Sequence, residues 1–192
     1  MSGLDRLWAG WRSSYIESVT SGPGGDATPG GSKDAGRSGC VFCAILGSGE
    51  DDEATHVLWR HSSGLAVAIL NAYPYCSGHL MVMPVRHVAS PELLEPSEAG
   101  ALWEGTSSAV SALRAAYKPD GLNLGANLGR AGGAGVPGHL HVHVLPRWEG
   151  DTNFMTSVAD TRVLPEPLDV SAGKLRRAWP AAGGYEAPAG GS

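Results

Sequence analysis

Three histidines alternate with apolar residues late in the chain, in the run His139-Leu140-His141-Val142-His143. Successive side chains of a β-strand point to opposite faces, so this spacing predicts a strand that presents all three imidazoles together. A core strand gains nothing from such a face, because buried ring nitrogens need hydrogen-bonding partners. Imidazole serves as a nucleophile, general base or metal ligand. We therefore interpret the run as a chemically active strand rather than as three exposed or structurally satisfied histidines.

A glycine-rich segment, residues 127–138, leads directly into these histidines. Glycines let consecutive backbone N–H groups converge on an anion, because no Cβ atom obstructs the approach. In a chain with 28 glycines, a flexible turn is the alternative interpretation. The position beside three histidines favours a phosphate-binding loop, with Asn127, Gly133 and Gly135 as candidate nucleotide-binding residues.

Two cysteines, Cys40 and Cys43, are separated by two residues, and Cys76 is the third cysteine of the chain. Three cysteines do not make a disulfide framework in a reducing compartment, whereas the Cys-x-x-Cys spacing is typical of half a zinc site. We expect Cys76 to be a thiol in a turn, and His56 and His61 to be surface residues.

Hydrophobic periodicity and turn residues predict the elements that must position these groups. A long helix opens at Pro91, with Ser90 as its N-cap, and ends before Pro119. Short helices are predicted near each end of the chain, at 4–16 and 168–179. Five strands are predicted, at about 56–60, 65–70, 79–85, 122–127 and 139–145, the first three as an antiparallel meander. The fold class is therefore α+β, with a five-stranded, mostly antiparallel sheet and one major helix.

The composition bounds the classes of function. A chain of 192 residues with 42% hydrophobic residues can build one domain with a core. A net charge of −5 argues against a nucleic-acid partner. Without an apolar run of about 18 residues or a signal-peptide core, we expect no membrane partner and a cytoplasmic location. The predicted organisation is an N-terminal extension at 1–19, a disordered Gly/Pro-rich linker at 20–39, a domain at 40–155, a C-terminal extension at 156–180 and a disordered tail at 181–192.

The run from His139 to Leu145 resembles the motif of the histidine triad (HIT) family, in which histidine alternates with an apolar residue three times. The resemblance covers roughly residues 40–155. It implies a HIT-like fold that pairs as a homodimer through the long helix and the adjacent strand. It also implies a nucleotide-binding enzyme without an organic cofactor, in which His141 attacks an α-phosphate and forms a nucleotidyl-histidine. His143 would contact the phosphate oxygens or help to protonate the leaving oxygen.

The same resemblance suggests roles for residues outside the triad. Asn71 takes the position of an Asn or Asp that binds the ribose hydroxyls, with a turn-capping role as the alternative. For His79, a structural hydrogen bond and a substrate contact both remain open. Many family members carry Ser or Gln where Gly135 stands here, and Arg130 is expected to compensate electrostatically. Trp148 either stacks on an adenine and closes over the phosphates or packs in a dimer.

The resemblance also implies a metal. Cys40, Cys43, His87 and His139 correspond to positions that several bacterial family members use for structural zinc. Two thiolates and two imidazoles make up a normal tetrahedral zinc set.

Residues 7–12 and 146–155 are similar to a bacterial branch of the family that includes diadenosine tetraphosphate phosphorylases and proteins like ATP adenylyltransferases. We therefore expect an enzyme that cleaves dinucleoside polyphosphates at the α-phosphate, by phosphorolysis or hydrolysis. The alternatives are a purine nucleoside phosphoramidase of the Hint type and a non-catalytic nucleotide-binding regulatory protein.

Overall fold

The computed structural model describes residues 39–151 and 165–181. The predicted helix at 4–16 lies outside the described residues, as do nearly all of the predicted linker and tail. In the part that is described, no helix is both long and apolar enough to cross a membrane.

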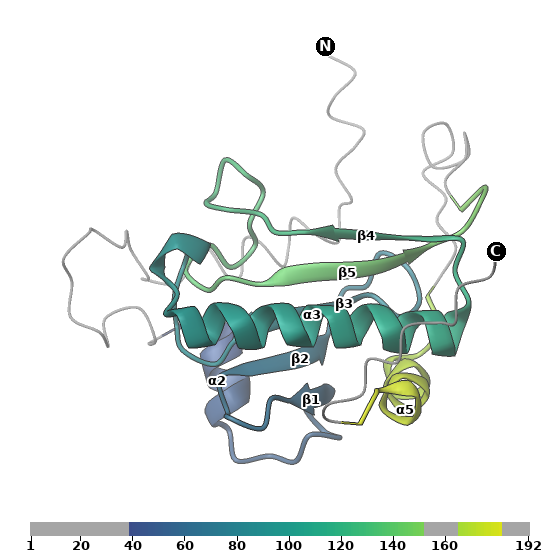
Figure 1. Cartoon of the computed structure of the whole chain (residues 1–192), viewed down its shortest axis with the longest axis horizontal. Coiled ribbons are helices and arrows are strands. Elements are labelled where there is room, and N and C mark those ends of the chain that lie inside the picture. Colours follow the sequence, from purple (N-terminus) through teal and green to yellow (C-terminus); the bar gives the residue numbers. More distant parts are fainter. Residues whose placement is uncertain (1–38, 152–164, 182–192) are drawn as a thin grey trace, which may run out of the picture.

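One antiparallel sheet organises the domain, as the sequence predicted (Figure 1). Every neighbouring pair of strands runs antiparallel, and the strand order is β1-β2-β3-β5-β4. The α+β fold with five strands is confirmed. The strands are β1 (Val57–Arg60), β2 (Ala66–Leu70), β3 (Leu80–Pro84), β4 (Gly121–Gly125) and β5 (Val142–Arg147).

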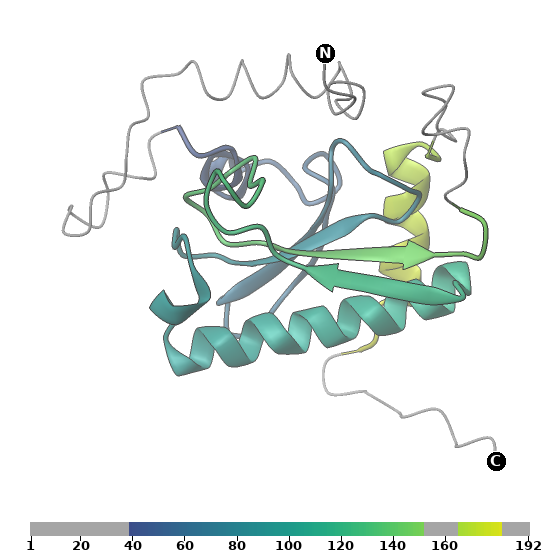
Figure 2. The same cartoon turned by 90° about the horizontal axis from the view of Figure 1, so that it is seen from above.

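Helices cover both faces of the sheet (Figure 2). The long helix α3 (Pro96–Tyr117) lies across one face, and α5 (Leu168–Ala178) packs beside α3 and against β1. The short helix α2 (Val41–Gly47) lies on the other face. Because both of their faces are covered, every residue of β2 and β3 is buried.

Two separate apolar clusters fill the two faces. On the α3 face, the buried side chains include Leu70, Leu80, Val82, Leu113 and Leu175. On the α2 face they are Cys40, Phe42, Val57, Val67, Ile69, Met81 and Met83. Gly105 lets α3 approach the sheet closely, since a Cβ atom there would lie 2.7 Å from the Trp59 ring. Side chains alternate between the two faces along β3, so Met81 points toward α2 whereas its neighbours Leu80 and Val82 point toward α3.

The long helix begins later than predicted. Residues Pro91–Leu93 form one 3₁₀ turn, and α3 starts only at Pro96, with Glu95 rather than Ser90 as its N-cap. A proline disfavours the helical conformation of the residue before it, and Glu95 is accordingly extended, with ψ 151°. Glu95 and Glu98 then form a reciprocal capping box that starts the helix.

Other boundaries also differ from the predictions. The fifth strand starts at Val142 instead of residue 139, because the Leu140 N–H bonds to the Val88 carbonyl and not to a neighbouring strand. The helix α2 was not predicted at all. The predicted helix at 168–179 is confirmed as α5.

Candidate active site and metal cluster

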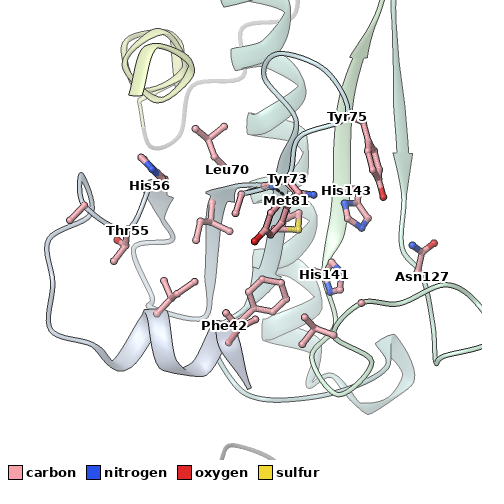
Figure 3. Close-up of a pocket in the computed structure, with 18 of the residues that line it drawn as sticks. Phe42, Thr55, His56, Leu70, Tyr73, Tyr75, Met81, Asn127, His141 and His143 are labelled. Carbon is pink, nitrogen blue, oxygen red and sulfur yellow. Dashed lines mark hydrogen bonds between the residues drawn. The ribbon is translucent and has the colours of Figure 1, made fainter. Parts of the chain in front are cut away.

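A cavity of about 340 Å³ lies between α2, the sheet and the glycine-rich segment. His141 and His143 line it together with Asn71, Asn127 and Gly133 (Figure 3). The volume falls in the range of about 300–1,000 Å³ that is usual for small-molecule sites. The structure therefore gathers one candidate nucleophile and most of the candidate nucleotide-binding residues around one hollow.

The three triad histidines all lie on the α2 side of the sheet, as the alternation predicted. His139 and His141 each make an edge contact with the Phe42 ring, and the rings of His141 and His143 have their centroids 5.0 Å apart. The intervening Leu140 belongs to the apolar cluster on the α3 side. The polar and apolar faces of this segment are thus separated as required for a chemically active strand.

His141 has the proton placement of a nucleophile. Its Nδ1 lies 2.7 Å from the backbone carbonyl oxygen of His139, and a carbonyl oxygen only accepts, so the ring carries its proton on Nδ1. The other nitrogen, Nε2, then keeps its lone pair. Burial lowers the pKa of His141, which keeps the ring neutral at pH 7. A neutral imidazole with a fixed tautomer is what nucleophilic attack requires.

His143 has the opposite proton placement, and His79 sets it. The Tyr75 backbone N–H donates to Nδ1 of His79 at 3.2 Å, so neutral His79 must carry its proton on Nε2. That N–H donates to Nδ1 of His143 at 3.0 Å, because the Asn71 amide nitrogen, 3.3 Å away, is itself a donor and cannot accept. His143 therefore accepts at Nδ1 and, when neutral, keeps its own proton on Nε2 as a donor.

His79 itself is fully buried and does not line the cavity. Of the two roles left open by the sequence, the structure supports the hydrogen bond to His143. Asn71 lines the cavity, and its amide oxygen also accepts from the Tyr73 N–H at 3.0 Å, so it caps the turn as well. The ribose-binding role of Asn71 stays a prediction.

The glycine-rich segment forms one wall of the cavity. Asn127 donates weakly to the Gly133 carbonyl at 3.4 Å, and Gly133 has a φ of +84°, which favours glycine. Gly135 lines the cavity too, and a Cβ atom added there would meet nothing within 4 Å. Exposed Arg130 is not among the lining residues, so nothing here supports its expected compensation for the missing side chain at Gly135.

The predictions for Trp148 and His56 are not supported by the lining of the cavity. Trp148 does not line the cavity, and its ring makes an edge contact with Tyr117, so stacking on a nucleotide stays a prediction that the cavity lining does not support. The prediction that His56 lies at the surface is wrong. His56 is half-buried, lines the cavity and has a left-handed φ of 56°.

The sequence analysis missed the apolar wall that α2 contributes. Val41, Phe42 and Ile45 line the cavity opposite the sheet residues Ile69 and Met81. The apolar pairs 41–42 and 45–46 have the spacing of one helical face, so a signal was present beside the cysteines. This wall suits a flat, apolar ring system.

The four predicted metal ligands lie together. Their ligating atoms are all within 4.8 Å of one another, with Cys40 and His139 buried and Cys43 and His87 half-buried. Nε2 of His139 lies 2.8 Å from the Pro84 carbonyl oxygen, to which it donates, so Nδ1 faces the thiols with a free lone pair. Burial lowers the pKa of His139 to about 4, which keeps that lone pair available. These residues could hold a metal ion.

Gly138 lies beside this cluster. A Cβ atom there would lie 3.2 Å from Nε2 of His87, so a side chain at this position would shift the His87 ring by a few tenths of an ångström. All three cysteines are free thiols.

Comparison with known proteins identifies the class. The sequence profile described as HIT domain matches residues 56–150, and the chain belongs to the HIT family. Within that family, an AP-4-A phosphorylase from Mycobacterium tuberculosis is 36% identical over 178 residues, which are 92% of this chain and 85% of that protein.

Solved structures agree with the fold. A zinc-bound histidine triad family protein from Mycobacterium smegmatis is 26% identical, with a TM-score of 0.59 over 74% of this chain and 94% of that chain. A hypothetical histidine triad nucleotide-binding protein from Sulfolobus tokodaii is also 26% identical, with a TM-score of 0.58 over 72% and 91% of the two chains. The predicted family and HIT-like fold are confirmed.

Proposed function

We propose that this protein cleaves dinucleoside polyphosphates, diadenosine tetraphosphate above all, at the α-phosphate through a covalent adenylyl-histidine on His141. The similarity to an AP-4-A phosphorylase over most of both chains supports this substrate class. The observation that carries the proposal is the opposite proton placement on His141 and His143 at one edge of an apolar cavity. Attack on the α-phosphorus needs the lone pair on Nε2 of His141, and the charge that develops on the phosphate oxygens needs a donor such as the N–H of His143.

Two displacements at phosphorus describe the reaction. In the first, Nε2 of His141 bonds to the α-phosphorus and the bond to the bridging oxygen breaks, releasing ATP. The Nε2–H of His143 donates a hydrogen bond to the phosphate oxygens and the leaving oxygen, where negative charge develops. In the second, an acceptor attacks the α-phosphorus and the bond to His141 breaks. Inorganic phosphate as acceptor gives ADP, and water gives AMP.

The cavity orients the nucleoside for this attack. With the α-phosphate at His141, a purine ring would be buried against the apolar wall that Phe42 and Ile45 form. Asn71 borders the same cavity and has an amide N–H group for the ribose hydroxyls. The glycines at 133 and 135 leave room for the phosphates beside the histidines.

We also propose that the ion held by Cys40, Cys43, His87 and His139 is zinc. A tetrahedral ion with Zn–S bonds of about 2.3 Å and Zn–N bonds of about 2.0 Å places sulfur and nitrogen about 3.5 Å apart. The Sγ atoms lie 3.4 to 3.6 Å from the Nδ1 atoms in the three closest contacts. A closed four-ligand zinc is structural and supplies folding energy rather than chemistry. Chelation should lower the melting temperature, and full stability and activity in metal-free protein would contradict the proposal.

The homodimer implied by the family resemblance remains a proposal. Trp103 on α3 is 67% exposed and Leu124 on β4 is 49% exposed, and β4 is an edge strand of the sheet. A second copy that covers this surface would bury both side chains. Sedimentation equilibrium tests it, and a monomer at micromolar concentration would contradict it.

The experiment that tests the activity incubates the purified protein with diadenosine tetraphosphate, with and without phosphate, and separates the products. We expect ADP and ATP when phosphate is present, and AMP and ATP in both mixtures if water is the acceptor. A matched His141→Ala protein should lose turnover and retain nucleotide binding. Product from an adenosine phosphoramidate alone would favour the phosphoramidase alternative, and binding without any product would favour the regulatory one.

A further inference from the structure

One end of the cavity is built by the turn that precedes β1. Glu50, Ala54, Thr55 and His56 all line the cavity from this turn. Figure 3 shows Thr55 and His56 across the cavity from His143 and Asn127. Since the proposed function places the phosphates at the histidines, the base of a bound nucleotide points toward this turn.

The turn is held in part by Asp51, which accepts from the Ala54 N–H at 2.7 Å and from the Thr55 hydroxyl at 2.9 Å, and by the Leu70 N–H, which donates to the His56 carbonyl at 3.1 Å. Its own backbone hydrogen bonds are long, from the Thr55 N–H to the Asp51 carbonyl at 3.2 Å and from the His56 N–H to the Glu53 carbonyl at 3.3 Å. The φ of His56, 56°, lies in the left-handed region, which is unfavourable for a residue with a Cβ atom. Such a conformation persists where the surroundings hold it in place.

Arg176 of α5 supplies that support from the far end of the chain. Its Nη2 donates to the carbonyl oxygen of Asp52 at 2.5 Å and to that of Val57 at 2.7 Å, and its Nε donates to Val57 at 3.2 Å. One guanidinium therefore holds both ends of the segment that carries Thr55 and His56. Hydrogen bonds from a charged donor are stronger than those between neutral groups.

The helix that carries Arg176 is itself firmly attached. Ser171, Ala172 and Leu175 are buried. Before the helix, the Glu166 carboxylate accepts hydrogen bonds from Ser171 at 2.9 Å, from Lys174 at 2.5 Å and from the Tyr117 hydroxyl of α3. This helix lies beyond the segment that matches the HIT domain, which ends at residue 150. The extension thus forms a fixed platform for the guanidinium.

We propose that Arg176 is a positioning residue for the base end of the nucleotide site, acting by holding the turn 52–57 in the shape that borders the cavity. The inference rests on the proposed function, because it requires a nucleotide in this cavity. Its consequence is selective: Arg176 supports binding of the base and leaves the phosphate end, which β5 and the glycine-rich segment build, unchanged.

The test compares Arg176→Met with Arg177→Met in the full-length protein. Arg177 is the next residue of the same helix and is exposed, so its variant controls for a lost charge on α5. Binding of AMP is measured by calorimetry, and binding of ribose 5-phosphate, which lacks the base, by displacement of AMP. We expect Arg176→Met to weaken AMP binding about tenfold, which corresponds to about 1.4 kcal/mol, and to leave ribose 5-phosphate binding and kcat unchanged. Arg177→Met should match the wild type.

Equal weakening of both ligands, or of neither, would overturn the inference and leave the proposed function standing. If Arg176→Met does not fold, Arg176→Lys carries the test. The lysine side chain is one bond shorter, so its ammonium ends short of the position of Nη2, the atom that donates to both carbonyl oxygens. Unchanged AMP affinity in that variant would also overturn the inference. A wild-type protein that binds no AMP would refute both the inference and the proposed function. A wild-type protein that binds AMP but turns over no substrate would refute the proposed catalysis alone.

Discussion

Replacing His79 by leucine removes the hydrogen bond that joins His79 to His143. Leucine has a similar volume but no ring nitrogens, so the variant removes the 3.0 Å contact to Nδ1 of His143. It also leaves the Tyr75 N–H without the acceptor it has at 3.2 Å. The first loss acts on the tautomer of His143 and the second on stability.

The expected sizes follow from these contacts. Loss of one net hydrogen bond costs about 0.5–1.5 kcal/mol, so kcat should fall about 2- to 13-fold. Replacing His143 itself removes the donor, for which losses of about 10²- to 10⁴-fold are usual. Loss of the acceptor for the Tyr75 N–H should lower the free energy of unfolding by about 1–3 kcal/mol. His79→Gln keeps an N–H donor on the side chain and should recover part of the lost rate.

The assay is a double-mutant cycle on kcat with His79→Leu, His143→Leu and the double variant. If His79 acts only by orienting His143, the double variant should be no slower than His143→Leu. Cys76→Ser, a change in the same loop, serves as the control and should keep the wild-type rate. Losses that multiply in the double variant would refute the reasoning, because His79 would then act on the substrate by a separate route.

Three further predictions rest on single contacts. Glu98 has a lowered pKa because Arg86 donates to its carboxylate, so the pair stabilises the fold above about pH 4.5 and this contribution is lost as the pH falls through the lowered pKa. Glu98→Gln should therefore cost about 1–2 kcal/mol at pH 7 and progressively less below pH 4.5 in denaturant titrations. Burial raises the pKa of Cys76 to about 11, so iodoacetamide should alkylate it far more slowly in native than in denatured protein at pH 8. A side chain at position 135 would meet open space, so Gly135→Ser should keep the wild-type melting temperature. The serine hydroxyl would add one hydrogen bond to a phosphate and should raise kcat/KM about threefold to tenfold. An unchanged kcat/KM would show that no phosphate lies there.

The sequence was sufficient where a local rule sets the geometry. The alternation of His139, His141 and His143 with apolar residues predicted which side of the sheet the rings would occupy, because strand pleating depends on nothing farther away. The spacing of Cys40 and Cys43 predicted half of a metal set in the same way. The strands of the meander were placed to within a residue or two for this reason.

Where contacts join distant parts of the chain, the sequence was not sufficient. His56 looked like a surface residue because the residues before it, 51–55, are mostly polar, and only the fold shows that the turn borders a cavity. The guanidinium of Arg176 reaches carbonyl groups 119 and 124 residues away. Backbone carbonyls carry no residue type, so no pattern of residue types could have predicted that contact. The start of α3 was missed for a local reason, since Pro96 and its effect on Glu95 were visible in the sequence.

The candidate metal ligand His139 and the candidate nucleophile His141 are only two residues apart in the chain. Cys40 and Cys43 lie at the start of α2, whose Phe42 makes an edge contact with the His141 ring at 5.1 Å. His139, another of the four residues of the cluster, also supplies the carbonyl oxygen that holds the proton of His141 on Nδ1. As a helix, α2 takes no part in the hydrogen bonding between the strands of the sheet. Loss of the proposed zinc ion should therefore loosen both the apolar wall and the hydrogen bond that fixes the tautomer of His141, while the hydrogen-bonded sheet remains intact.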